Sequence, residues 1–124
     1  MNTSIKTAFF KTLFFTALTA ITILAFLPDY DSLPPLVSFS DLLNHTVAFT
    51  VLFILFRQSY PALMTKHIVI YLCSYALLIE AVQYYLPTRY GSWGDIGADG
   101  TGLLLGYLIL SILRRFTYTK NLFS

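Results

Sequence analysis

The chain has 124 residues, of which 56% are hydrophobic and only 11% charged, and its mean hydropathy is +0.69. A soluble domain of this size could not cover its surface with so few polar side chains, so the composition predicts an integral membrane protein. The length corresponds to one domain covering residues 1–124. A single cysteine, Cys73, excludes an internal disulfide and any Cys-x-x-Cys metal or redox motif. We expect no nucleic-acid partner, because a net charge of +2 gives no indication of one.

The apolar stretches predict an all-α fold, a bundle of four transmembrane helices. The first span covers about residues 8–27, contains Lys11 near its start and ends before Pro28. A cleaved signal peptide is the alternative for this stretch. We rank it lower because the apolar run is longer than a usual signal-peptide core and no Ala-x-Ala pattern precedes Pro28. The other spans cover about residues 41–56, 68–86 and 95–113.

The basic residues predict how the bundle is oriented. If both termini are cytoplasmic, Arg89 is the only one of the eight lysines and arginines on the outer side. Because cytoplasmic segments carry the excess of basic residues, we expect this orientation. The acidic residues lie the other way, in or beside the two outer loops, with Glu80 in the outer half of the third span.

Polar residues converge on the outer end of the predicted bundle. Within each span they are three or four residues apart, so they share one helix face. Glu80 is the hardest to explain as structural, because a carboxylate inside an apolar helix is by default a functional-site hypothesis. The predicted binding residues are Asp41, His45, Glu80, Gln83, Arg89, Asp95 and Asp99.

Each of these residues also has a structural interpretation. Asp41 and Asp95 follow serines by three residues, a spacing typical of helix caps. Gln83 could hold two helices together through a hydrogen bond, and Arg89 could anchor at the headgroups or pair with Glu80. A metal site built from the acids is weak because His45 is the only outer histidine, so we expect no metal and no cofactor.

Small residues recur every four positions in the last span, at Ala98, Gly102 and Gly106. This spacing places them on one helix face, where they would let a neighbouring helix approach closely. We therefore expect helix packing rather than ligand binding from this stripe.

The spaced polar residues resemble the VanZ-like family of small bacterial membrane proteins. The resemblance covers about residues 41–106. Leu42 departs from it by standing where the family usually has a lysine, and Asp99 by standing where an asparagine is common. Both departures make the outer cluster more acidic. The matching positions are Asp41-x3-His45-x3-Phe49, Glu80-x2-Gln83-x3-Pro87-x-Arg89, Asp95, Asp99 and Gly102-x3-Gly106.

The resemblance implies a multi-helix protein of the bacterial cytoplasmic (inner) membrane, with membrane lipids as its surroundings. The founding member of the family is linked to low-level resistance to teicoplanin, a lipid-bearing glycopeptide that acts on the outer face. We rank first a non-enzymatic envelope protein that binds an envelope lipid, a cell-wall precursor or a lipophilic glycopeptide. A purely structural bundle comes second. An intramembrane enzyme comes third, with Glu80 as acid or base, His45 as its partner and Arg89 as an anion clamp.

Overall fold

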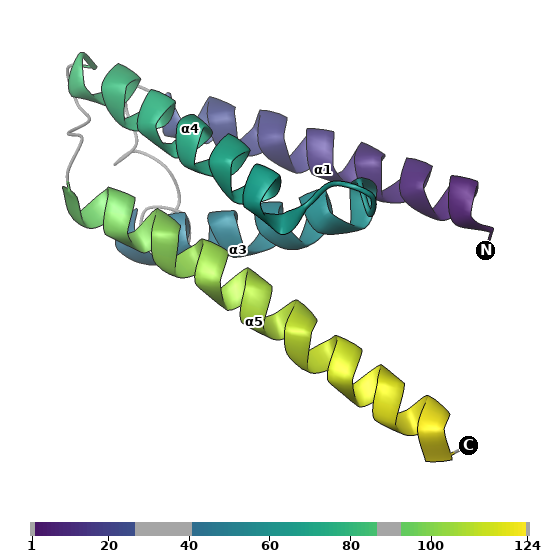
Figure 1. Cartoon of the computed structure of the whole chain (residues 1–124). Coiled ribbons are helices and arrows are strands. Elements are labelled where there is room, and N and C mark those ends of the chain that lie inside the picture. Colours follow the sequence, from purple (N-terminus) through teal and green to yellow (C-terminus); the bar gives the residue numbers. More distant parts are fainter. Residues whose placement is uncertain (1, 27–40, 87–92, 124) are drawn as a thin grey trace.

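The computed structural model describes residues 2–26, 41–86 and 93–123, and within these ranges the chain forms four helices and no strand. The side chains of Asp41 and of residues 118–123 lie outside the description. The expectation of an all-α fold is confirmed. The helices, shown in Figure 1, are α1 (Thr3–Ala25), α3 (Asp41–Ser59), α4 (Thr65–Tyr84) and α5 (Trp93–Phe123).

The helices follow the predicted spans, and the largest differences are at the start of α1 and the end of α5. α1 begins at Thr3 rather than near residue 8, because the Asn2 side chain accepts a 2.9 Å hydrogen bond from the Ile5 amide and caps the helix. α5 continues past residue 113 to Phe123, since neither glycine nor proline follows Gly106 in the chain. The cap at Asn2 and the lack of a helix-breaking residue after Gly106 therefore explain why both helices are longer than their apolar stretches.

Three of these helices are long and apolar enough to cross a membrane: Thr3–Ala25, Thr65–Tyr84 and, within α5, Trp93–Thr117. α3 has 19 residues but carries polar side chains towards both ends, among them His45 and Arg57. The crossing of α3 and the cytoplasmic position of both termini stay predictions.

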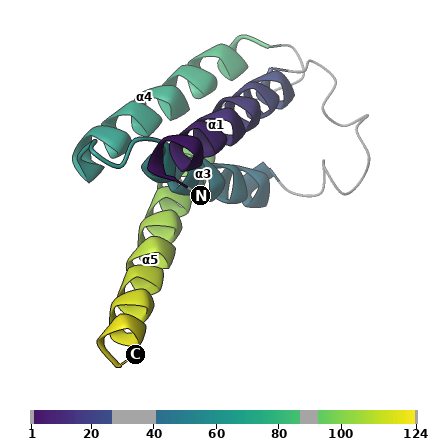
Figure 2. The same cartoon turned by 90° about the vertical axis from the view of Figure 1, so that its right-hand side faces the viewer.

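α3 is the central helix of the bundle. It packs against α1, α4 and α5, as Figures 1 and 2 show from two directions. Its Phe49, Leu52 and Phe53 are no more than 1% exposed. Because α3 has protein on several sides, it can carry polar residues that a lipid-facing helix could not.

Aromatic contacts join the outer helices to this centre. The Phe14 ring of α1 lies 4.8 Å from the Phe56 ring of α3, and Phe14 is the buried residue of α1.

Large apolar side chains are exposed on all four described helices, as Ile23, Val47, Leu78 and Leu104 illustrate. Such surfaces are suited to contact with lipid chains.

Successive described helices run in opposite directions, so four helix ends meet at one end of the bundle (Figure 1). These are the C-terminal ends of α1 and α4 and the N-terminal ends of α3 and α5, and we call this the cluster end. At the other end, the Lys11 ammonium lies 4.9 Å from the centre of the Tyr60 ring, beside the α3–α4 turn. The described lysines and arginines lie towards this second end: Lys6, Lys11, Arg57, Lys66, Arg114 and Arg115.

Candidate functional site: a buried polar cluster

His45 of α3 and Asp99 of α5 form a hydrogen-bonded pair at the cluster end. His45 Nδ1 lies 2.6 Å from Asp99 Oδ1. Asp99 is only 2% exposed, although a carboxylate away from water is costly unless its oxygens have partners. One oxygen of Asp99 is held by the imidazole. The other, Oδ2, is buried and has no hydrogen-bond partner among the described residues.

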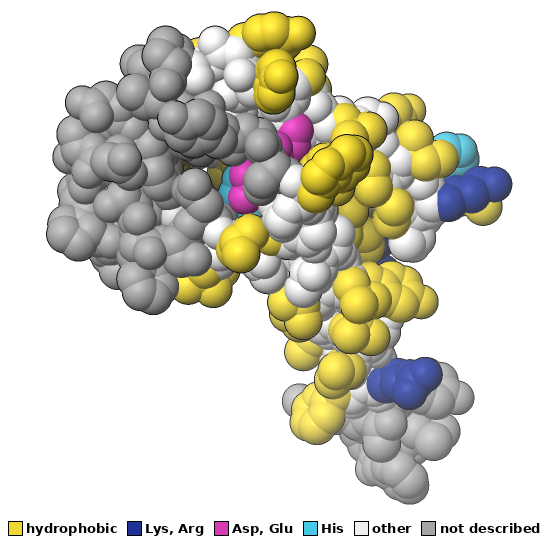
Figure 3. Space-filling view, turned by 90° about the vertical axis from the view of Figure 1, so that its left-hand side faces the viewer, with side chains coloured by type: hydrophobic (Ala, Val, Ile, Leu, Met, Phe, Trp, Pro, Cys, Tyr) yellow, Lys and Arg dark blue, Asp and Glu magenta, His cyan; other side chains and the backbone are white. Residues whose placement is uncertain are grey.

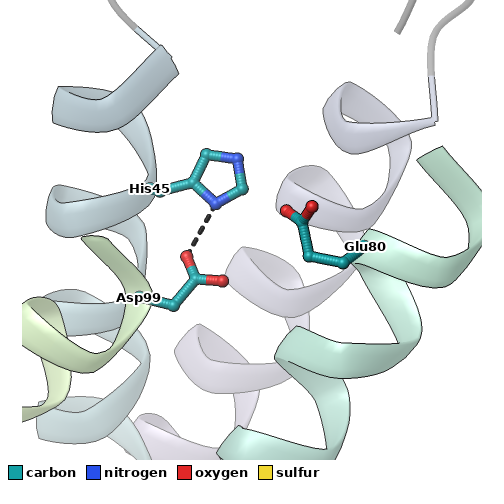
Figure 4. A group of neighbouring side chains, drawn as sticks. All are labelled: His45, Glu80 and Asp99. Atoms are coloured by element: carbon teal, nitrogen blue, oxygen red, sulfur yellow. Dashed lines mark hydrogen bonds and ion pairs between the residues drawn. The ribbon is translucent and has the colours of Figure 1, made fainter. Parts of the chain in front are cut away.

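Glu80 of α4 completes the group from the opposite side. It is 8% exposed, and a carboxylate oxygen lies within 4.8 Å of the facing atoms of both His45 and Asp99. Figure 4 shows its carboxylate directed towards the His45–Asp99 pair. Three separate helices therefore contribute one side chain each.

Asp95 lies one turn before Asp99 in the first turn of α5. It is 6% exposed, and its Oδ2 is 4.0 Å from His45 Nε2. A carboxylate in the first turn of a helix is also favoured by the helix dipole, so the capping interpretation of Asp95 holds beside its contact with the imidazole. His45, Glu80, Asp95 and Asp99 together are the polar cluster.

Acidic side chains and a histidine reach the surface on one side of the molecule. In Figure 3, acidic side chains and a histidine are visible between hydrophobic side chains, and the visible lysines and arginines lie elsewhere on the molecule. The polar cluster is thus a small, mainly acidic patch within an apolar bundle.

Gln83 serves a different purpose from the cluster. Its side-chain amide donates a 2.9 Å hydrogen bond to the carbonyl of Ala25, and the residue is 1% exposed. The last carbonyls of a helix have no partner within the helix, so Gln83 of α4 satisfies one at the end of α1. This geometry corresponds to the interhelical interpretation rather than to a ligand contact.

Two predicted members of the site cannot be placed with the others. Arg89 lies outside the described residues, and so do Pro28 and Pro87. Asp41 is the first residue of α3, at the cluster end, but its side chain is outside the description.

Gly102 and Gly106 pack against α3. A Cβ atom on Gly102 would lie 2.5 Å from the Thr46 carbonyl oxygen, and one on Gly106 would lie 2.9 Å from Phe53 Cβ. Ala98, at the head of the same stripe, is 9% exposed, and its carbonyl accepts a 3.4 Å hydrogen bond from Thr46 Oγ1. This close approach of α5 to α3 places Asp99 against His45.

The threonines that face the glycine stripe were not among the residues predicted from the sequence. Thr50 Oγ1 donates to the Gly102 carbonyl at 3.1 Å, as Thr46 does to Ala98 one turn earlier. Thr46 and Thr50 are four residues apart on the second predicted span, which places their hydroxyl groups on one helix face. This spacing could have predicted hydrogen bonds to a neighbouring helix.

An apolar groove of about 460 Å³ lies between α1, α3 and α4. Phe14, Phe56, Tyr71 and Tyr75 are among the aromatic residues that line it. Tyr75 shares a hydrogen bond with Thr22 of α1, and its ring centre is 5.9 Å from that of Phe49. Tyr60 and Leu63 at the α3–α4 turn also line the groove, so it lies towards the end of the bundle opposite the polar cluster.

The fold and the cluster define a helical membrane protein whose few buried charged groups are gathered where four helix ends meet. The family model described as VanZ/LLP1 matches residues 2–114, and the chain belongs to this family. The resemblance seen in the sequence is confirmed by this match. The comparison with curated proteins found no match, and neither did the comparison with solved structures.

Proposed function

We propose that the protein is a multi-pass protein of the bacterial cytoplasmic membrane that binds the polar headgroup of a lipid-linked envelope molecule in the polar cluster. A membrane or cell-wall precursor lipid and a lipophilic glycopeptide antibiotic such as teicoplanin are the ligand classes. The observation that carries the proposal is the buried Asp99 carboxylate, which has one oxygen on His45 and the other without a described partner. If the Asp99 carboxylate only held the helices together, we would expect both of its oxygens to accept hydrogen bonds from the protein.

The surroundings of the cluster support a ligand that is partly polar and partly apolar. The cluster lies at an end of the bundle, where a headgroup can enter from the boundary between membrane and water. Exposed apolar side chains near the cluster end, such as Leu42, Tyr84 and Trp93, offer a surface for a hydrocarbon chain. The lysines and arginines that the structure describes lie towards the other end, which supports a cluster on the outer side, since basic segments favour the cytoplasm.

Bound lipids measured by mass spectrometry test this proposal. The wild-type protein and the Glu80→Gln variant are purified from the same membranes in mild detergent, and co-purifying lipids are compared. We expect one lipid class to be enriched with the wild type and lost with Glu80→Gln, while Gln83→Met, outside the cluster, retains it. Equal lipid composition in all three preparations would overturn the proposal.

An intramembrane enzyme is the second candidate. The observation that favours it is the imidazole of His45, which is held by a buried carboxylate, an arrangement used by general bases. In that case the His45→Gln variant keeps its lipid but accumulates substrate in place of product. If His45→Gln instead loses the lipid and no new species appears, binding without catalysis is favoured.

A further inference from the structure

The sequence led us to expect no metal, but the polar cluster that the fold assembles has the composition of a metal site. His45, Glu80 and Asp99 each offer one ligand atom, and these three atoms lie within 4.8 Å of one another. They come from α3, α4 and α5, so the bundle itself brings them together (Figure 4). One imidazole nitrogen and two carboxylate oxygens are ligands of divalent transition metals such as Zn²⁺ and Mn²⁺.

A second observation points to a bound cation. Asp99 is 2% exposed, and its Oδ2 has no hydrogen-bond partner among the described residues. In Figure 4 this second oxygen is directed towards the side on which Glu80 lies. An acceptor buried without a donor is destabilising, and a cation between Asp99 and Glu80 would remove that cost.

The charge of the cluster points the same way. Asp95 and Asp99 both lie against the imidazole of His45, and a Glu80 oxygen lies within 4.8 Å of the facing atoms of His45 and Asp99. Carboxylates gathered away from water repel one another unless a positive charge lies between them. A divalent ion held by Asp99 and Glu80 would lower this repulsion.

We propose that His45, Glu80 and Asp99 bind a divalent transition-metal ion at the cluster end. The 2.6 Å separation of His45 Nδ1 and Asp99 Oδ1 is that of a hydrogen bond. Ligand atoms of a zinc site are about 3–3.5 Å apart, because each lies about 2 Å from the ion. Small side-chain rotations in His45 and Asp99 therefore accompany binding, and the ion replaces the proton that the two residues share.

Three protein ligands leave a coordination position open. In zinc sites such a position takes water or an oxygen of a bound molecule. The carboxylates of the cluster repel a phosphate or carboxylate oxygen. A bound ion would give the cluster an affinity for such an oxygen. Metal binding does not depend on the lipid-linked ligand proposed above and is tested without it.

Zn²⁺ is the probe for this site. The full-length protein in detergent is freed of metal with a chelator and titrated with Zn²⁺ in a calorimeter. We expect one ion per chain, and at least about tenfold weaker binding in His45→Gln, Glu80→Gln and Asp99→Asn. His67→Gln and Cys73→Ser remove exposed potential ligands on α4 and should leave the affinity unchanged.

Melting without metal shows which variants fold, and weakened binding in any folded cluster variant supports the proposal. Two results would overturn it: no stoichiometric binding by the wild type, or binding that depends on His67 and not on the cluster. Lipid retention by the metal-free protein is measured separately. If Zn²⁺ does not bind but the lipid is retained, only the metal proposal fails. If Zn²⁺ binds but no lipid class is retained, only the ligand proposal fails.

Discussion

The hydroxyl of Thr50 donates a 3.1 Å hydrogen bond to the carbonyl oxygen of Gly102, so a side chain of α3 reaches the backbone of α5. Such contact requires a small residue on the facing helix, and in membranes helix association depends on close packing of this kind. Moving towards the cluster end, His45 lies five residues before Thr50 and Asp99 three before Gly102. The packing of this glycine face therefore sets the distance between imidazole and carboxylate.

A methyl group at Gly102 should destabilise the protein. The Cβ of Gly102→Ala would be 2.5 Å from a backbone oxygen, which can yield only if the helices separate. We expect a loss of about 1–3 kcal/mol in unfolding free energy, measured by melting in detergent. Gly100→Ala is the matched control because nothing lies within 4 Å of its Cβ position, and the better helix former should stabilise by up to about 1 kcal/mol. Equal effects of both substitutions would contradict the packing argument.

Gln83 should matter for stability more than for ligand binding. Gln83→Met keeps the approximate volume but leaves the Ala25 carbonyl without its donor. The expected cost is about 1 kcal/mol, the usual net value of such a bond. Lipid retention and Zn²⁺ affinity should stay within twofold of wild type. Loss of either in a protein that melts normally would place Gln83 in the site.

Phe14 should anchor α1 to the rest of the bundle. Phe14 is 4% exposed, whereas its neighbour Phe15 is 50% exposed. In a membrane the cost of Phe14→Ala is mainly that of the lost packing, because lipid solvates apolar groups as well as the core does, and we expect about 1–3 kcal/mol. Phe15→Ala should change the melting temperature little. If both variants melt alike, α1 is not held by this contact.

The orientation can be tested with single cysteines in a Cys73→Ser background. Tyr85 is 83% exposed near the cluster end, and Ser4 and Ala62 are exposed towards the other end. An impermeant thiol reagent added to intact cells should label Tyr85→Cys and spare the other two. Labelling of Ala62→Cys alone would place the polar cluster on the cytoplasmic side.

The amino-acid sequence by itself determined the class of the protein and the approximate course of its helices. Apolar runs of about 20 residues can be recognised in the sequence without tertiary structure, because membrane thickness sets their length. The family was also accessible from the spacing of a few polar residues, such as His45 and Glu80. The ends of the helices were harder to predict from the sequence. The cap at Asn2 and the long C-terminal part of α5 depend on local hydrogen bonds rather than on hydropathy.

Only the tertiary structure showed which of the predicted polar residues lie together in the polar cluster and which one bonds a neighbouring helix. Glu80 and Gln83 share one stretch of α4, yet Glu80 turns towards His45 and Asp99 while Gln83 bonds the end of α1. Their distinction depends on which neighbouring helix each faces, and periodicity within one helix carries no information about the neighbour. The acidity of the cluster was visible in the sequence. The meeting of a nitrogen and two oxygens within metal-binding range depends on the packing of three helices, which the α3–α5 glycine contact helps to set.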